Sequence, residues 1–224
     1  MIRVAIARPA PSSREPFEAW VLDLLGCVAM GGTESTAIER VPGAIDDYLR
    51  HAHGLAPIAP RGDVDVVERF DAWWERDYEV NAFFRHVDLA PVTRSDVDFA
   101  TSLLARTRSA LLEAARHAGP GIEGDRNVDG VLRHVAKVEW WYATRLDLAP
   151  RHEPTGADVR DVDDLLVEAR EMLLARFDGF PAVGTMVRGH QEERWTARKI
   201  LRRAIYHELD HVLELEGRAM ATVR

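Results

Sequence analysis

The apolar residues in the second half of the chain recur at three- and four-residue spacing, the period that gives an α-helix one apolar face. In the first such segment these residues are Phe99, Leu103, Leu104, Leu111 and Leu112. Capping residues, glycines and prolines divide the second half into four segments. We expect the four helices to cover about 96–117, 127–148, 158–177 and 196–220. Helices of this kind bury their apolar faces against one another, so the sequence predicts an all-α antiparallel four-helix bundle over residues 93–224.

Residues 1–92 follow a different pattern, with short β-rich runs in place of the helical spacing. The runs cover 2–7, 17–22, 64–70 and 78–84. One helix-like segment lies between the two early runs and the two later ones. This order predicts a small α+β domain whose one main helix covers a face of the sheet.

The helix-like segment of this first domain extends from Thr33, a suitable N-cap, to His53, and Gly54 follows as a stop. Pro42-Gly43 interrupts it. Because proline cannot continue a helix without losing a hydrogen bond, we expect either a kink or two shorter helices.

The last predicted helix contains two histidines, His207 and His211, four residues apart. Residues at this spacing differ by about 40° around a helix and about 6 Å along it, so both rings can reach one cation. His134 shares a face of the second predicted helix with apolar residues and points toward the interior. A single histidine would most simply be a core or surface residue, but the three together predict one divalent metal site. Histidine ligands suit zinc, nickel and iron alike, so the ligand type does not select the metal.

His207–His211 also match the H-E-x-x-H pattern of zinc proteases, in which the glutamate acts as a base. Only residues 212–224 follow, too few for the downstream helix that brings a third ligand. The glycine and third histidine of the extended protease pattern are also missing from this stretch. We therefore disfavour a metalloprotease.

Three acidic residues lie near the predicted histidine ligands. Glu139 falls on the inner side of its helix, where a buried carboxylate needs a partner. We expect a structural ion pair with Arg202-Arg203, with a catalytic base as the alternative. Glu208 should pair with an arginine as well. Asp210 is a candidate for contact with a metal-binding histidine, or else a solvated charge.

Two aromatic residues, Trp141 and Tyr142, lie on the same side of the second predicted helix as His134. Aromatic side chains usually contribute to packing. The alternative is that both line the pocket around the metal.

Composition narrows the classes of partner and compartment. The chain has 37 acidic and 29 basic residues, a formal net charge of −8, which disfavours binding to nucleic-acid phosphates. With one cysteine, Cys27, no intramolecular disulfide can form, and a cytoplasmic location is expected. The sequence has no apolar run long enough for a membrane span. We expect a homodimer, only because dimers are the commonest oligomers of soluble proteins.

The second half resembles the DinB / YfiT-like superfamily of metal-binding four-helix bundles. Two stretches carry the resemblance, RNVDGVLRHVAKVEWWYATRLD at 126–147 and RWTARKILRRAIYHELDHVLELE at 194–216. In the first, an inward histidine precedes a glutamate by five residues, and aromatics follow. The resemblance implies a divalent metal, such as nickel, zinc or iron, held by His134, His207 and His211. It also implies, for some members, an enzyme that uses a low-molecular-weight thiol cofactor.

The first half is similar to HicB-like domains over residues 18–54, where a strand, Leu24-Leu25-Gly26-Cys27, a Gly-Thr turn and a helix follow one another. Leu25 stands where such domains usually have proline. This resemblance implies a regulatory or substrate-shaping domain beside the bundle.

Two functions from different classes follow from the sequence. The first is a metal-dependent enzyme, such as a transferase, isomerase or hydrolase, that acts on a small-molecule substrate. The alternative is a non-enzymatic binding or regulatory protein, in which the metal is structural or vestigial and the HicB-like domain binds a partner.

Overall fold

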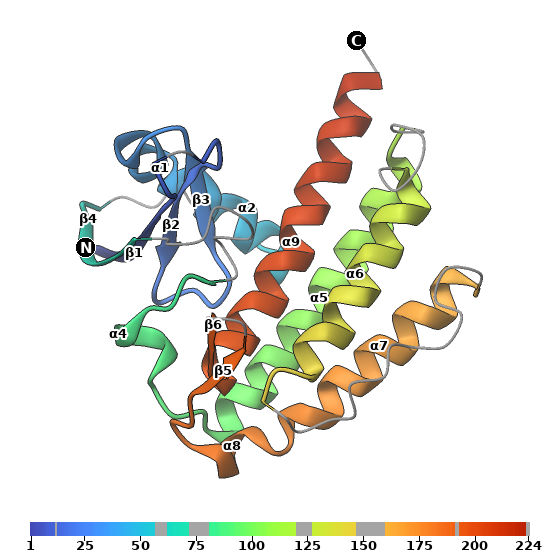
Figure 1. The fold of residues 1–224 in the computed structure, drawn as a ribbon. Helices are drawn as coiled ribbons and strands as arrows, with labels where there is room; N and C mark the ends of the chain where they lie inside the picture. Colours follow the sequence, from blue (N-terminus) through green and yellow to red (C-terminus); the bar gives the residue numbers. More distant parts are fainter. Residues whose placement is uncertain are drawn as a thin grey trace.

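A computed structural model describes residues 1–11, 13–56, 62–71, 81–119, 127–146, 160–190 and 193–222. A small mixed sheet with two helices forms the N-terminal region, and a predominantly helical region follows it (Figure 1). This order of a sheet region and a helical region agrees with the sequence prediction. Among the described residues, none of the helices combines the length and the apolar character that a membrane span requires.

The sheet has four strands in the order β3-β2-β1-β4. They are β1 (Ile2–Arg8), β2 (Phe17–Val21), β3 (Val28–Gly31) and β4 (Val64–Asp71). β1, β2 and β3 form an antiparallel meander, whereas β4 pairs in parallel with β1. A parallel neighbour requires a crossover connection, and the helical segment between β3 and β4 lies in it. The described part of the run expected at 78–84, residues 81–84, is not a strand.

The crossover contains two helices, α1 (Glu34–Glu39) and α2 (Val41–His53). The Thr33 hydroxyl accepts a hydrogen bond from the Thr36 N–H at 3.1 Å and so caps α1. Helix α2 has Pro42 in its first turn, where an N–H has no helical partner in any case. Gly54 ends α2 with a left-handed φ of 65°. The expectation of two shorter helices is confirmed, and the break lies at Arg40.

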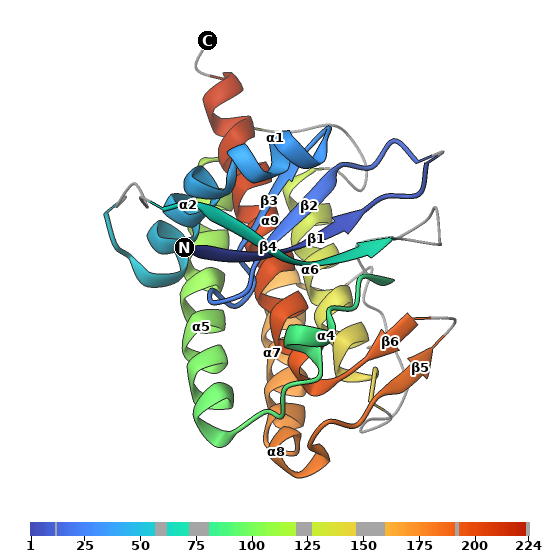
Figure 2. The ribbon, with the colours of Figure 1, turned by 90° about the vertical axis from the view of Figure 1, so that its left-hand side faces the viewer.

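Both faces of the sheet are buried along β1. Successive residues of this strand point to opposite sides of the sheet, and Val4 to Ala7 are all buried. Val4 and Ile6 belong to a cluster with the apolar side chains of α1 and α2. Ala5 and Ala7 face the other way and pack with Trp20 and residues 82 and 84. The second face is therefore covered by the chain that leads into the helical region (Figure 2).

Four long helices make up most of the second region, and shorter elements connect them. The long helices are α5 (Arg94–His117), α6 (Val128–Ala143), α7 (Val162–Phe177) and α9 (Ala197–Thr222). The shorter elements are α4 (Arg85–Asp88), α8 (Phe180–Val183), β5 (Arg188–His190) and β6 (Glu193–Trp195). The four expected helices are present; α7 is capped by Asp161, and Asp158, the expected cap, lies outside the described residues.

The long helices form two pairs whose members run in the same direction. Arg198, near the start of α9, contacts Asp96 at the start of α5 at 2.8 Å, and Glu208 further along α9 contacts Thr107 of α5. Helices α6 and α7 are likewise parallel, and both run opposite to α5 and α9. The antiparallel prediction therefore holds between the pairs but not within them.

The two regions share one core. A single cluster of buried residues contains Val4 and Ile6 of the sheet together with Leu103 of α5 and Ile205 of α9, so it crosses the expected boundary at residues 92 and 93. The turn between β2 and β3 touches α9 most closely at Gly26. A Cβ at Gly26 would lie 2.7 Å from Ile205 Cγ2 and 2.9 Å from the backbone nitrogen of Tyr206.

We predict that Gly26→Ala destabilises the protein by at least about 2 kcal/mol. The residue has a φ of 88°, which disfavours any side chain, and the added methyl group would overlap helix α9. Urea unfolding of both proteins measures the difference. Gly32→Ala is the matched control, since a Cβ there meets nothing within 4 Å, and it should change stability by less than about 0.5 kcal/mol. Equal stability of the Gly26 and Gly32 variants would contradict this packing.

Candidate metal centre

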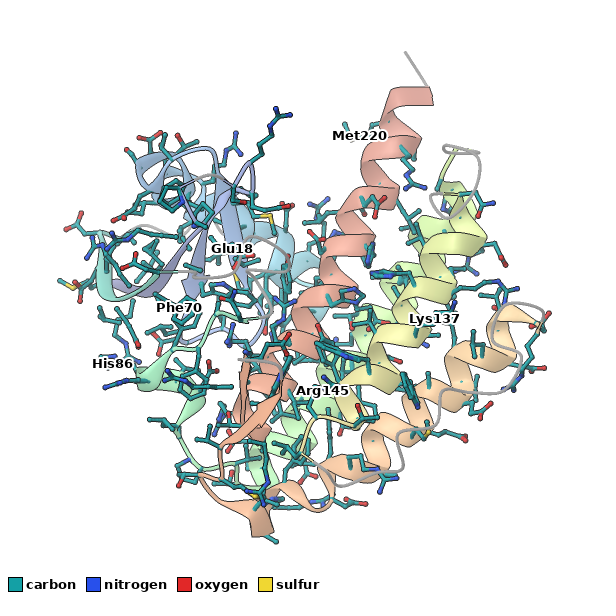
Figure 3. The ribbon with its side chains drawn as sticks, in the orientation of Figure 1. Glu18, Phe70, His86, Lys137, Arg145 and Met220 are labelled. Atoms are coloured by element: carbon teal, nitrogen blue, oxygen red, sulfur yellow. The ribbon has the colours of Figure 1, made fainter. Side chains whose placement is uncertain are left out.

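His134 on α6 and His207 and His211 on α9 converge through their Nε2 atoms. The Nε2 of His207 lies 3.1 Å from that of His134 and 3.3 Å from that of His211. One ligand atom from each ring lies within 4.8 Å of the other two. Figure 3 labels Lys137 of α6 and Arg145, which follows the end of that helix. The structure therefore brings together the three residues that the sequence proposed as ligands.

The spacing of these nitrogens can be compared with that around a bound ion. Zinc–imidazole bonds are about 2.0–2.1 Å long, so two nitrogens of a tetrahedral site lie about 3.3–3.4 Å apart. At right angles, the same bonds place the nitrogens about 2.9 Å apart. The observed 3.1 and 3.3 Å lie within or close to this range. The three rings are thus close enough to hold one metal ion.

Burial changes steadily across the three histidines. His134 is exposed, His207 is partly buried, and His211 is only 6% exposed. Burial lowers the pKa of His207 well below its ordinary value, and the neighbouring His211, His134 and Arg203 lower it further. Neutral imidazole is the form that binds metal, so the surroundings favour the ligand form. The exposed edge at His134 leaves the centre open to solvent.

Glu214 orients His211. The Nδ1 of His211 donates to a carboxylate oxygen of Glu214 at 2.7 Å, and Arg218 forms an ion pair with the same carboxylate. A proton fixed on Nδ1 leaves the lone pair of Nε2 for the ligand site. Partial burial raises the pKa of Glu214, but hydrogen bonds and charge from His211 and Arg218 outweigh this and lower it overall.

Glu214 was not predicted to orient a ligand, although its spacing of three from His211 on one helix could have indicated this role. Asp210 was the acidic candidate on this helix. The structure places Asp210 beside Leu209 and Leu213, where it lines a cavity between α9 and the sheet region.

Tyr142 lies closer to the histidines than Trp141 does. The buried ring of Tyr142 meets the ring of His207 edge-on, with centroids 6.2 Å apart. Trp141 instead packs edge-on against Trp195, at 5.2 Å, and the Arg145 guanidinium lies 4.2 Å above its ring. Tyr142 therefore packs against one of the three histidines, and its place in a metal pocket stays a prediction.

Glu139 and Glu208 form a buried ion cluster with two arginines. Glu139 contacts Arg108 at 2.9 Å and Arg170 at 2.5 Å, and Glu208 contacts the same two residues at 2.5 and 2.9 Å. Thr107 also donates to Glu208. Burial raises the pKa of Glu139, and the charge of Glu208 adds to this effect, while Arg170 and Arg108 oppose it.

The expectation that Glu139 forms a structural ion pair is confirmed, but the expected partners were wrong. Arg202 extends from α9 toward the sheet region, where it pairs with the buried Asp88 at 2.8 Å and lies 4.3 Å above the ring of Trp20. Glu139 faces α5 and α7, so its guanidinium partners come from those helices.

Comparison with known proteins gives no assignment, because no protein-family model, curated protein or solved structure matches the chain. The resemblances proposed from the sequence therefore remain predictions.

We predict that Arg170→Met destabilises the protein by about 3–5 kcal/mol, because it leaves two carboxylates in the interior with one guanidinium. Chemical denaturation measures the loss. The control is Arg116→Met, which removes an exposed arginine paired with Glu113 and should cost less than about 0.5 kcal/mol. A cost for Arg170→Met as small as the control's would show that the cluster does not hold the helices together.

Proposed function

We propose that this chain holds one divalent metal ion with His134, His207 and His211 and that it is a DinB-like, metal-dependent enzyme acting on a small molecule. The observation that supports the proposal is the convergence of three Nε2 atoms from two helices, at 3.1 and 3.3 Å. The helical region is then a four-helix bundle of the DinB / YfiT-like type, and residues 1–92 form a HicB-like domain beside it.

Three imidazoles suit a catalytic metal better than a purely structural one. Structural zinc sites use four protein ligands, whereas catalytic sites leave a position for water or substrate. A metal bound here would polarise a substrate oxygen or lower the pKa of a bound water or thiol. The exposed His134 edge gives a small molecule a route to that position.

The chain's own residues prepare the centre. Glu214 holds the tautomer of His211, and the ring of Tyr142 limits the position of His207. Glu208 of the ion cluster follows His207 directly, and Glu139 lies five residues after His134. The cluster therefore keeps α6 and α9 in register. These contacts are made by the protein's own side chains. Removal of the metal with a chelator should therefore leave the bundle folded with a vacant site, whereas removal of a structural metal would unfold it.

Elemental analysis of protein purified without added metal tests the proposed site. We expect close to one equivalent of zinc, nickel or iron in the wild type and less than about a tenth of that in His207→Ala, because two remaining histidines bind weakly. His117→Ala, which removes an exposed histidine of α5, should keep the wild-type content. A wild type that neither contains metal nor takes it up on addition would rule out the centre.

The role of Glu214 can be tested separately. Glu214→Gln should weaken metal affinity by about 10–100-fold, since the ring of His211 loses its charged acceptor. Competition with a chromophoric chelator measures this affinity. Glu113→Gln, which alters an exposed carboxylate of α5, should leave it unchanged. If both variants bind like the wild type, Glu214 does not orient the ligand.

A further inference from the structure

The cavity that Asp210 lines lies between the sheet region and α9. Its volume is about 470 Å³, within the range of about 300–1,000 Å³ that small-molecule sites occupy. The turn before β3, helices α1 and α2, and one face of α9 enclose it. Its α9 residues, including Tyr206, Asp210 and Leu213, alternate in sequence with His207 and His211, so the cavity and the histidine centre lie on different faces of this helix.

The wall of the cavity is predominantly apolar. Apolar side chains come from three elements: Val28 and Ala29 from β3, Ala44 from α2, and Leu209 and Leu213 from α9. Leu213 is 40% exposed. A site of this kind favours a ligand with an apolar body.

One buried hydroxyl in the wall has no hydrogen-bond partner. Tyr48 is only 3% exposed, and its hydroxyl makes no hydrogen bond within the part of the chain that the structure describes. Buried hydroxyls are normally paired, and a polar ligand atom that reached this hydroxyl would supply the missing partner. Burial raises the pKa of Tyr48, and the negative charge of an ionised Cys27, which also lines the wall, raises it further.

Charged groups around the cavity are predominantly acidic. Glu39, Asp47 and Asp210 line it, against one guanidinium in the wall, that of Arg40, which donates to the carbonyl of Met30 at 2.9 Å. Arg50, which is not part of the wall, forms an ion pair with Asp47. His51 also lines the cavity, and burial lowers its pKa, which favours the neutral ring. The wall therefore presents a negative potential to a ligand, and a cation is the complementary charge.

We propose that this cavity binds a small organic cation, an alkyl or aryl amine, with its apolar part among the wall residues and its ammonium group near the carboxylates. The Tyr48 hydroxyl and the Asp47 carboxylate are the polar contacts that select it. The site does not depend on the metal proposed above, and it assigns the sheet region a ligand-binding role of its own.

Three probes of equal chain length separate charge from apolar contact: hexylammonium, hexanol and hexanoate. Calorimetry on the full chain should show one hexylammonium bound per protein, with hexanoate at least tenfold weaker and hexanol in between. Asp47→Asn should weaken hexylammonium by about fivefold or more and leave hexanol unchanged. Asp98→Asn, which alters an exposed carboxylate of α5 away from the cavity, should bind all three probes like the wild type.

The cysteine gives an independent readout, since Cys27 is the only one in the sequence. Hexylammonium should slow its alkylation by N-ethylmaleimide at least several-fold, and hexanoate should not. Gly43→Leu, at a cavity position where a Cβ meets nothing within 4 Å, should abolish hexylammonium binding while the protein stays folded by circular dichroism.

The proposal is overturned if hexylammonium does not bind, if hexanoate binds as tightly, or if Asp47→Asn and Gly43→Leu leave hexylammonium binding intact. Metal content is measured separately, so a missing metal would not affect these results, and a failed amine titration would leave the histidine centre standing.

Discussion

A buried cluster of two carboxylates and two guanidiniums determines how the helices are placed. Each long helix contributes one charge: Arg108 from α5, Glu139 from α6, Arg170 from α7 and Glu208 from α9. Both carboxylates are at most 2% exposed, so sliding one helix along another would leave a charge in the interior without its partner. The cluster therefore fixes the register of α6 and α9. It lies next to His207 in sequence, which is why the three histidine rings meet.

Helix α9 connects the two regions because each of its faces contacts a different part of the protein. One face carries His207 and His211, and another carries Glu208 into the ion cluster. A third face, which includes Arg202 and Tyr206, packs against Trp20 of the sheet. This third face also forms one wall of the cavity, so a ligand there would contact the helix that holds the histidines. The close approach at Gly26 keeps the sheet region in this position.

Local features of the structure could be predicted from the sequence, because they depend on neighbouring residues. Apolar spacing indicated the helices, Thr33 and Gly54 marked the ends of α1 and α2, and the four-residue spacing of His207 and His211 indicated a shared site. Features set by distant parts of the chain were missed. The parallel pairs of helices depend on where the connections run, which apolar spacing does not encode. The partners of Glu139 lie 31 residues away on either side, and many arginines could have fulfilled that role.

X-ray absorption spectroscopy of the protein loaded with one equivalent of zinc tests the central claim most directly. We expect a first shell with three imidazole nitrogens at about 2.0–2.1 Å and at least one oxygen ligand from solvent. The imidazole contribution should fall to two rings or fewer in the His134→Ala protein. A first shell of oxygens, or a spectrum that is the same with and without His134, would contradict the assignment of these three histidines as the metal ligands.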